Sequence, residues 1–285
     1  MITLRSGEQI PLEMHKIKVV QKSYLLPVKE RQAAITKASN NTFLLPTRDI
    51  FLDMLTDSGT NAMSDRQVGA SMVADDSYAG SETFYRLKDK LKSFFGTDYF
   101  LPAHQGRACE NIIAETFVTE GSIVPMNFHF TTTHAHIAKR GGSIAELLID
   151  EGFKITSDHP FKGNMCPDKL RALIAKEGDK IAFVRMEAGT NLIGGQPFSL
   201  ANLQEISQIC AENELMLVLD ASLLSDNLYF IKEREEAAKE MSLREIVHAI
   251  ADACDIIYFS ARKLGSARGG GICSNSLELI EEMKE

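Results

Sequence analysis

The sequence predicts an α/β fold built on a mostly parallel, seven-stranded sheet with a doubly wound order of elements. Short apolar runs alternate along the chain with segments of helical periodicity, which is typical of a parallel sheet covered by helices. Several runs are apolar throughout, as expected for strands that are buried on both faces. With 285 residues, of which 44% are hydrophobic and 25% charged, the chain is long enough for one large globular domain.

The regular alternation of elements begins at residue 81. Strands are predicted at residues 98–102, 122–126, 144–149, 181–186, 215–220, 255–260 and 270–273. Helices are predicted at residues 82–95, 108–118, 168–176, 199–213 and 233–253. The first helix is expected to stop at Gly96, because glycine after a helical run is a C-cap signal. Another helical pattern, which is acidic, starts at residue 276.

Residues 1–56 differ from the rest of the chain, because charged and apolar residues alternate there with several turn formers. Such a segment cannot bury a core of its own. We therefore expect an N-terminal arm with short helices that packs on a partner subunit. Residues 57–285 are expected to form one large domain.

Composition excludes several classes of protein. The net charge of -8, with Lys and Arg spread along the chain, argues against binding to nucleic acid. No apolar run has the length of a membrane span, and the first residues do not build a signal peptide, so we expect a cytoplasmic protein with no membrane contact. The five cysteines are odd in number and lack CxxC spacing, which supports neither a disulfide framework nor a zinc site.

Two apolar runs end in residues that can hold opposite ends of a pyridine ring. The run 215–219 stops at Asp220, and the run 256–259 stops at Ser260, three residues before Lys263. A buried carboxylate keeps a pyridine nitrogen protonated, and a lysine amine forms a Schiff base with an aldehyde, which is the pairing that pyridoxal 5'-phosphate requires. The alternative is that Asp220 caps a helix and Lys263 is a solvated charge.

Two further segments have the composition of ligand loops. Gln105, Gly106 and Arg107 lie between a predicted strand and a predicted helix, where backbone N–H groups and the helix dipole create an anion site. The turn therefore predicts a phosphate pocket. Residues 56–61 are rich in short polar side chains and form either a connection or a ligand cradle.

Longer blocks of sequence point to a known family. The blocks are LTDSGTNAMSD (55–65), YAGSE (78–82), HQGR (104–107), FTTT (130–133), GGQP (194–197) and YFIK (229–232). With them, the chain resembles the β-eliminating lyases, a family of pyridoxal phosphate enzymes that includes tyrosine phenol-lyase and tryptophanase, and it is more similar to the former. The resemblance covers nearly the whole chain and implies a fold type I, aspartate aminotransferase-like large domain.

The resemblance implies a cofactor-binding role for eight residues. It assigns the phosphate to Gln105, Gly106, Arg107 and Ser260. It places Phe130 on the ring face, Asn191 at the ring hydroxyl and Asp220 at the ring nitrogen, while Lys263 carries the cofactor. Taken alone, Phe130 is better explained as a core residue and Asn191 as a turn residue.

The implied reaction is the α,β-elimination of an aromatic amino acid to pyruvate, ammonia and the free aromatic, a step of amino-acid catabolism. Besides Lys263, the resemblance makes Tyr78 catalytic, as the phenol that protonates the leaving group, although an interface tyrosine is the alternative. Thr56 and Thr131 match positions near the substrate side chain. Because the family's site lies at a dimer interface, a homo-oligomer, dimer or tetramer, is also implied.

Several positions depart from the family pattern. Leu223 stands where the family has an arginine that contacts the ring hydroxyl, a loss of a charged donor worth about 1.5 to 3 kcal/mol. Arg262 replaces the lysine that usually precedes Lys263. The family's monovalent-cation site maps to Gly59 and Asp76, but Arg268 occupies a third position of that site, and we expect its guanidinium to make potassium unnecessary.

Family members also continue into a smaller C-terminal domain, which supplies the arginine that binds the substrate carboxylate. We therefore expect this chain to be truncated before that domain, and to be inactive alone at a family-like rate. Three readings stay open: an active lyase, a degenerate paralogue that binds cofactor or a partner without turnover, and one half of a split tryptophanase-like enzyme whose small domain is a separate chain.

Two competing motifs are weak. Residues 260–263 match S-x-x-K and residues 225–227 match S-D-N of the serine β-lactamases, but their order along the chain is reversed and no K-T-G follows. Residues 269–271 are glycines that precede an apolar strand instead of a helix, which argues against a Rossmann dinucleotide site.

Overall fold

The computed structural model describes residues 2–3, 5–7, 9–10, 22–53 and 63–284, in two compact units, residues 1–57 and 58–285. The elements of the first unit are β1 (Ile2–Thr3), β2 (Gln9–Ile10), α1 (Val28–Lys37) and the 3-10 helices η1 (Thr42–Leu44) and η2 (Thr47–Asp49). β1 and β2 pair antiparallel. Ala38 is the one buried apolar residue among the described residues of this unit, so its described part has little core.

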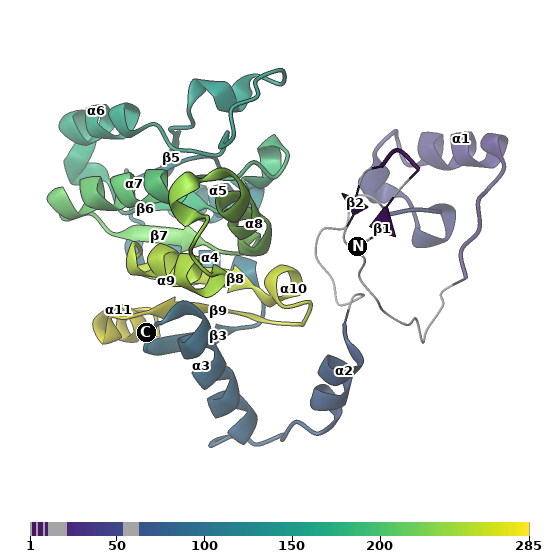
Figure 1. The fold of residues 1–285 in the computed structure, drawn as a ribbon, viewed down its shortest axis with the longest axis horizontal. Helices are drawn as coiled ribbons and strands as arrows, with labels where there is room; N and C mark the ends of the chain where they lie inside the picture. The colour runs from purple at the N-terminus through teal and green to yellow at the C-terminus, as the bar shows by residue number, and fades with distance from the viewer. Residues whose placement is uncertain (1, 4, 8, 11–21, 54–62, 285) are drawn as a thin grey trace. The chain divides into compact units, whose positions relative to one another are not determined.

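The second unit contains a seven-stranded sheet with the order β3-β9-β8-β7-β6-β4-β5 (Figure 1). The strands are β3 (Tyr99–Ala103), β4 (Ile123–Met126), β5 (Ser143–Glu146), β6 (Val184–Glu187), β7 (Leu217–Asp220), β8 (Ile256–Ser260) and β9 (Gly270–Ser274). Strands β5, β4, β6, β7 and β8 run parallel to one another, whereas β9 runs antiparallel to both β3 and β8. The predicted seven-stranded, mostly parallel sheet is confirmed.

Helices cover both faces of this sheet (Figure 1). The helices of the second unit are α2 (Asp65–Met72), α3 (Glu82–Phe95), α4 (Gly106–Phe117), α5 (Thr131–Lys139), α6 (Pro167–Glu177), α7 (Leu200–Glu212), α8 (Leu224–Arg234), α9 (Leu243–Asp252), α10 (Ala261–Leu264) and α11 (Leu277–Glu282). Four 3-10 helices connect them: η3 (Asp150–Phe153), η4 (Gly178–Lys180), η5 (Asn191–Ile193) and η6 (Glu236–Ala238).

Alternation along the central strands divides the core into two layers. In β7, Leu217 and Leu219 pack among residues of α6 to α9, whereas Val218 packs among residues of α4, α5 and α11. Successive side chains of a strand point to opposite faces, so Asp220 faces the same side as Val218, toward α4. This parity decides which helix meets the polar end of β7.

The helix predicted over residues 233–253 is wrong. In the structure, α8 ends at Arg234, and α9 begins only after Ser242. Ser242 and Glu245 form a capping box, in which each side chain accepts a hydrogen bond from the other residue's backbone N–H group. The Lys232 ammonium donates to the carbonyl of Met241 at 2.7 Å and thereby closes the intervening turn. The apolar periodicity continued through the break and concealed it.

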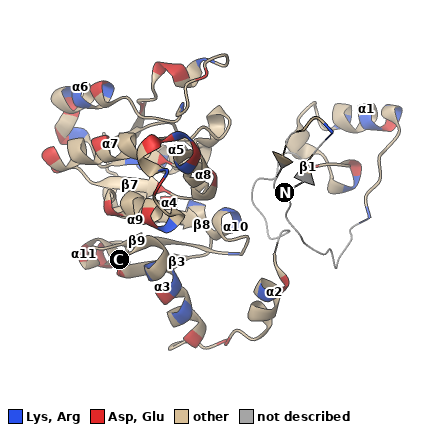
Figure 2. Ribbon diagram, viewed as in Figure 1, with Lys and Arg blue, Asp and Glu red and all other residues tan. Residues whose placement is uncertain are grey.

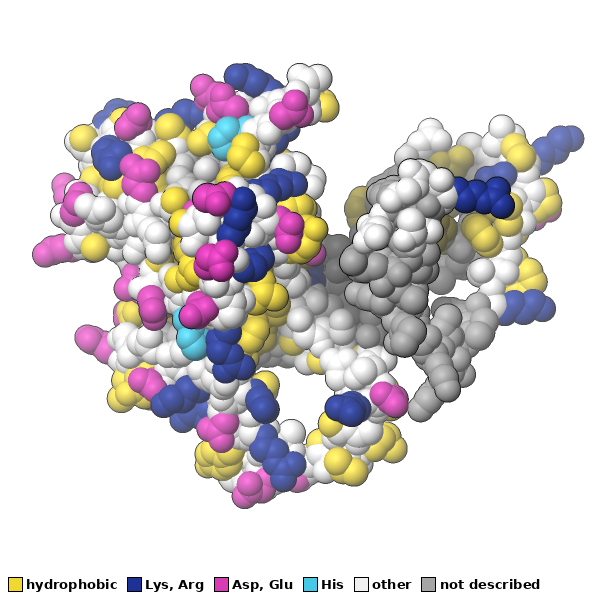
Figure 3. Space-filling model, in the orientation of Figure 1, with side chains coloured by type: hydrophobic (Ala, Val, Ile, Leu, Met, Phe, Trp, Pro, Cys, Tyr) yellow, Lys and Arg dark blue, Asp and Glu magenta, His cyan; other side chains and the backbone are white. Residues whose placement is uncertain are grey.

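Charged residues of both signs are interspersed along the outer helices of the second unit (Figure 2). Exposed apolar side chains gather on α2, α3 and the segment between them (Figure 3). The most exposed of these are Val68, Met72, Val73, Tyr78 and Tyr85. Within the described ranges, no helix is long and apolar enough to cross a membrane.

One buried amide fixes the segment that follows β6. The Asn227 side chain is fully buried, and its Oδ1 accepts hydrogen bonds from the backbone N–H groups of Gly189 at 3.1 Å and Phe198 at 3.0 Å. Its Nδ2 donates to the Phe198 carbonyl at 3.0 Å. One side chain of α8 thus holds both ends of the segment that contains Asn191.

Replacing Asn227 with alanine leaves these buried backbone groups without partners. We expect Asn227→Ala to lower the free energy of unfolding by about 2 to 4 kcal/mol, measured by urea denaturation. The matched control is the exposed neighbour Ser225→Ala, which should change it by less than about 0.5 kcal/mol. Equal stability of the two variants would contradict this account of the segment.

Candidate cofactor site

Three polar side chains lie in one row across the carboxyl ends of the parallel strands. Glu187 and Asp220 are the last residues of β6 and β7, and they are register partners. Asp220 is in turn the register partner of Tyr258 in β8. Register partners in neighbouring strands point to the same face, so these side chains converge toward α4.

The Asp220 carboxylate is buried and held by three donors. Its Oδ2 accepts a hydrogen bond from Arg185 Nη2 at 2.7 Å and from the Tyr258 hydroxyl at 2.9 Å. Its Oδ1 accepts from the backbone N–H group of Ser222 at 2.9 Å. A buried carboxylate requires such pairing, because an isolated charge there costs several kcal/mol. The carboxylate therefore has one defined orientation.

Arg185, the cation of this network, was not predicted from the sequence. Its side chain is 1% exposed, and its guanidinium also donates to Glu187 Oε2 at 3.1 Å from both Nη1 and Nη2. A charged residue inside the apolar run 181–186 was the available signal, since a fully buried arginine is rare unless it is paired.

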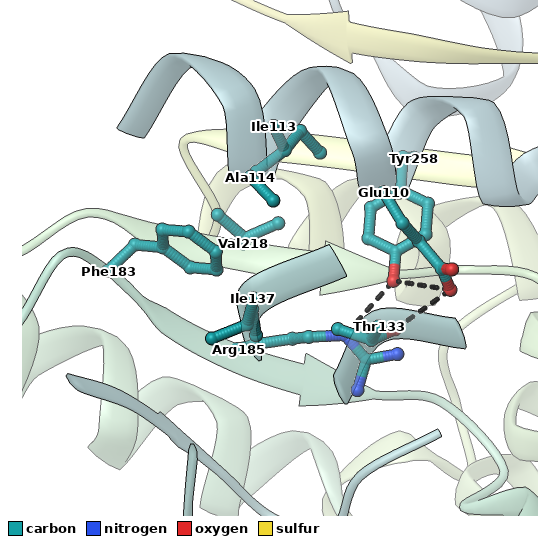
Figure 4. Close-up of a pocket in the computed structure, with 9 residues that line it drawn as sticks. All are labelled: Glu110, Ile113, Ala114, Thr133, Ile137, Phe183, Arg185, Val218 and Tyr258. Carbon is teal, nitrogen blue, oxygen red and sulfur yellow. Dashed lines mark hydrogen bonds between the residues drawn. The ribbon is translucent and has the colours of Figure 1, made fainter. Parts of the chain in front are cut away.

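Glu110 on α4 extends the network from above the sheet. Its carboxylate accepts hydrogen bonds from the hydroxyls of Thr132 and Thr133, and the Tyr258 hydroxyl lies 3.5 Å from it. Figure 4 shows Glu110, Thr133 and Tyr258 pointing toward one another beside a cavity of about 10 Å³, the lower limit for one water molecule. Burial, and then the negative charge of Asp220, raises the pKa of Glu110. Glu110 and Tyr258 were not predicted from the sequence either.

The residues predicted to bind a phosphate meet at the N-terminus of α4. Gln105 precedes this helix, and no side chain caps it there. A Cβ atom on Gly106 would lie 2.8 Å from the Ser260 Cβ, so glycine is needed for the close approach of α4 and the end of β8. Uncapped N–H groups, the helix dipole and the Ser260 hydroxyl together form an anion cradle. The Arg107 side chain is exposed at the start of the helix.

The lysine and the aromatic ring predicted for the cofactor are neighbours. Lys263 lies on α10, directly after β8, and Phe130 directly precedes α5. The Lys263 ammonium nitrogen is 5.1 Å from the centroid of the Phe130 ring. Two segments that are far apart in the sequence therefore place an amine and an aromatic face at the same edge of the sheet.

Asn191 and Leu223 lie on adjoining loops. Asn191 begins η5, and its backbone N–H group donates to Glu187 Oε1 at 2.9 Å. Leu223 precedes α8 and packs against Gly189, where an added Cβ would be 3.1 Å from the Leu223 Cβ. Asn191 is thus tied through Glu187 to the Arg185 network, while Leu223 brings an apolar side chain to the same loop.

Other predicted site residues are not brought to this edge. Tyr78 and Asp76 are exposed on the segment between α2 and α3, and Thr131, the first residue of α5, is exposed beside Phe130. Thr56 and Gly59 lie outside the described residues. The described ranges contain no cluster of three potential metal-ligating side chains, and the cation site stays a prediction.

The donor set fits pyridoxal phosphate. An uncapped helix N-terminus, a buried carboxylate, an aromatic face and a lysine amine match the phosphate, the ring nitrogen, the ring and the aldehyde of this group. Because Gly106 has no side chain, the N-terminus of α4 lies directly against Ser260, the second residue assigned to the phosphate.

Comparison with known proteins identifies a family for this chain. The profile of the β-eliminating lyase family matches residues 53–285. Tyrosine phenol-lyase from Symbiobacterium sp. (strain SC-1) is 40% identical over 94% of this chain and 59% of its own length. Tyrosine phenol-lyase from Pasteurella multocida (strain Pm70) is 38% identical over 96% of this chain and 60% of its own length. The chain therefore spans about three-fifths of the length of these curated relatives.

Solved structures share the fold. One from Exiguobacterium sp. 255-15, described as a candidate aromatic amino acid beta-eliminating lyase/threonine aldolase, has a TM-score of 0.56 at 18% identity and covers 80% of this chain and 60% of its own. The aminotransferase TlmJ from Streptoalloteichus hindustanus has a TM-score of 0.50 at 16% identity and covers 77% of this chain and 51% of its own. The fold is that of the fold type I pyridoxal phosphate enzymes, as predicted.

The raised pKa of Glu110 makes stability depend on pH. Because folding favours its protonated form, its contribution is complete below the ordinary pKa of 4.5 and is lost as the pH rises through the folded-state value. Glu110→Gln removes this titration. The free energy of unfolding of the variant, relative to that of the wild type, should therefore be higher at about pH 8 than at about pH 5, measured by urea denaturation.

Glu115→Gln on the exposed side of the same helix is the control. A hydrogen bond from Arg140 lowers the pKa of Glu115, so this carboxylate is ionised throughout that pH range. Its replacement should shift the free energy of unfolding equally at both pH values. A pH-independent difference for Glu110→Gln would disprove the assignment.

Proposed function

The chain belongs to the β-eliminating lyase family, and from this premise we propose that it binds pyridoxal phosphate and serves the α,β-elimination of an aromatic amino acid. The observation that carries the proposal is the convergence of the uncapped α4 N-terminus, the buried Asp220 carboxylate and the Lys263 amine beside Phe130 at one edge of the sheet. The names of the curated relatives, tyrosine phenol-lyases, support an aromatic substrate.

Each residue of this edge has a distinct task in the proposal. The N–H groups of α4 and the Ser260 hydroxyl hold the phosphate, and the Phe130 ring stacks on the pyridine ring. Asp220 keeps a proton on the ring nitrogen, and the Lys263 amine holds the aldehyde and then moves the proton at the substrate Cα atom. When bound, pyridoxal phosphate supplies the electron sink that makes this proton acidic.

Protonation of the leaving group is assigned to Tyr78. Its phenol is fully exposed, on a segment where other large apolar side chains are exposed as well. A patch of this kind is typical of a protein interface. We infer that the chain assembles as a homo-oligomer in which Tyr78 acts in the site of a second copy. Thr131, the exposed residue that follows Phe130, is assigned by the resemblance to the substrate side chain.

A second candidate function is binding of the cofactor without turnover. Leu223 favours binding without turnover. It brings an apolar side chain to the loop beside Asn191, at a position where the resemblance implies an arginine. The chain spans about three-fifths of the length of its curated relatives. A form of this second candidate in which a separate chain supplies further parts of the site is proposed beside it. Potassium is not required in either case, because Arg268 supplies a positive charge at the family's cation position.

Cofactor binding is tested by reductive labelling. After incubation with pyridoxal phosphate and reduction with borohydride, peptide mass spectrometry should find the label on Lys263, because this amine lies beside the proposed ring position. Lys263→Arg should lose the label. The matched control Arg262→Lys adds an amine at the exposed neighbouring position, and its label should stay on Lys263. A folded wild-type chain without label would refute the proposed function.

Turnover is tested by pyruvate release from L-tyrosine. We expect this chain to be at least about tenfold slower than the Symbiobacterium enzyme measured beside it, because Leu223 cannot stabilise the ring oxygen as a charged donor would. Leu223→Arg should recover part of the rate. Release at the relative's own rate by the unmodified chain would rule out the role given to Leu223 and the second candidate function.

A further inference from the structure

Arg185 has a more complete set of partners than structural charge neutralisation needs. An arginine has five N–H donors, and all five of Arg185 have acceptors. Nε donates to the Tyr258 hydroxyl at 3.0 Å, Nη1 donates to the Phe128 carbonyl at 3.4 Å and to Glu187 at 3.1 Å, and Nη2 donates to Glu187 at 3.1 Å and to Asp220 at 2.7 Å. The guanidinium plane is therefore fixed in one orientation.

This guanidinium links two groups that are proposed to contact the same ring. On one side it bonds directly to Asp220, the partner of the ring nitrogen. On the other side it bonds to Glu187, whose second oxygen holds the backbone N–H group of Asn191, the residue assigned to the ring hydroxyl. A displacement of Arg185 would thus change the positions of both contacts.

We propose that Arg185 is a positioning residue for pyridoxal phosphate: it holds Asp220 against the ring nitrogen and, through Glu187, holds Asn191 against the ring hydroxyl. This inference rests on the proposed function of the site. Leu223 takes the place of the arginine that the resemblance implies next to the ring. In the proposal, Arg185 on β6 supplies a cation near the ring instead, through its bond to Asp220.

Charge balance explains why this position matters to the ring. Arg185 bonds to two carboxylates, Glu187 on β6 and Asp220 on β7, and to the Tyr258 phenol on β8. The Tyr258 hydroxyl also lies 3.5 Å from a third carboxylate, Glu110 on α4. Without the guanidinium, neighbouring buried carboxylates would repel each other, and one of them would take up a proton. A protonated or rotated Asp220 could no longer accept a hydrogen bond from the protonated ring nitrogen.

A test must separate this role from simple stabilisation of the fold. The double variant Arg185→Met with Glu187→Gln removes one positive and one negative charge together, and the Gln side-chain oxygen can still accept from Asn191 N–H. The probes are pyridoxal phosphate and its deaza analogue, in which CH replaces the ring nitrogen. The readout is the ratio of the two dissociation constants, measured by the absorbance of the bound ligand.

The wild type should prefer pyridoxal phosphate over the deaza analogue, because Asp220 accepts a hydrogen bond only from the former. In the double variant we expect this preference to fall by at least about tenfold, while affinity for the deaza analogue changes by less than about threefold. Arg185→Lys, which keeps the charge but not the planar fork, should recover part of the preference. If Arg185 only stabilised the fold, the double variant would lose affinity for both ligands equally, and the ratio of the two dissociation constants would not change.

Lys162→Met is the control for loss of a buried cation. The Lys162 side chain is buried in the same unit and donates to the carbonyls of Lys154 and Ser157, and neither residue is part of the proposed site. This variant should lose stability and keep the wild-type preference. If the double variant does not fold, as judged by circular dichroism, Arg185→Lys decides alone: a reduced preference supports the proposal, and an unchanged preference overturns it.

Failure of the inference differs from failure of the proposed function. A wild type that binds both ligands at Lys263 with equal affinity, or a double variant that keeps the full preference, overturns the role of Arg185 and leaves the cofactor site standing. A folded wild type that takes no label at Lys263 overturns the proposed function, and the role of Arg185 with it.

Discussion

The site depends on one electrostatic constraint, the neutralisation of carboxylates at the buried end of a parallel sheet. Glu187 and Asp220 must lie side by side because they end neighbouring strands in register. Each is 7% exposed or less, a position where an unpaired charge costs several kcal/mol. Arg185, which lies on β6 two residues before Glu187, offsets that cost because its guanidinium pairs with both carboxylates. Strand register and ion pairing therefore fix the position and orientation of the Asp220 carboxylate independently of any ligand.

The packing of α4 on the same face of the sheet sets the separation between the helix N-terminus and the Asp220 carboxylate. Gly106 lets the helix N-terminus approach Ser260 at the end of β8 closely enough that any side chain would collide. The positive end of the helix dipole is thereby held on the same side of the sheet as Asp220, which ends the neighbouring strand β7. A helix and a strand, not loops, position the anion cradle and the carboxylate. The two groups are therefore held at a fixed separation, which binding of a small planar ligand at both of its ends requires.

Local signals predicted a large part of this architecture. The helix expected at residues 82–95 has the same bounds as α3, because Ser81 caps its start and Gly96 its end. The strand ends at Asp220 and Ser260 were located from the apolar runs alone. The single helix expected over residues 233–253 was wrong, since apolar periodicity hides a break whose evidence is the capping box that begins at Ser242. The roles of the site residues came from family resemblance and remain proposals.

By itself, the sequence determined the class of fold and the residues at the ends of its strands, because burial on both faces and short-range capping leave periodic marks along the chain. Only the tertiary structure decided which polar side chains form one network. Arg185 and Asp220 are 35 positions apart in the chain, and Tyr258 and Glu110 are 148 positions apart. No local pattern joins residues at such separations. Their proximity arises from strand order, register and the face of the sheet that α4 covers, and these are properties of the folded chain.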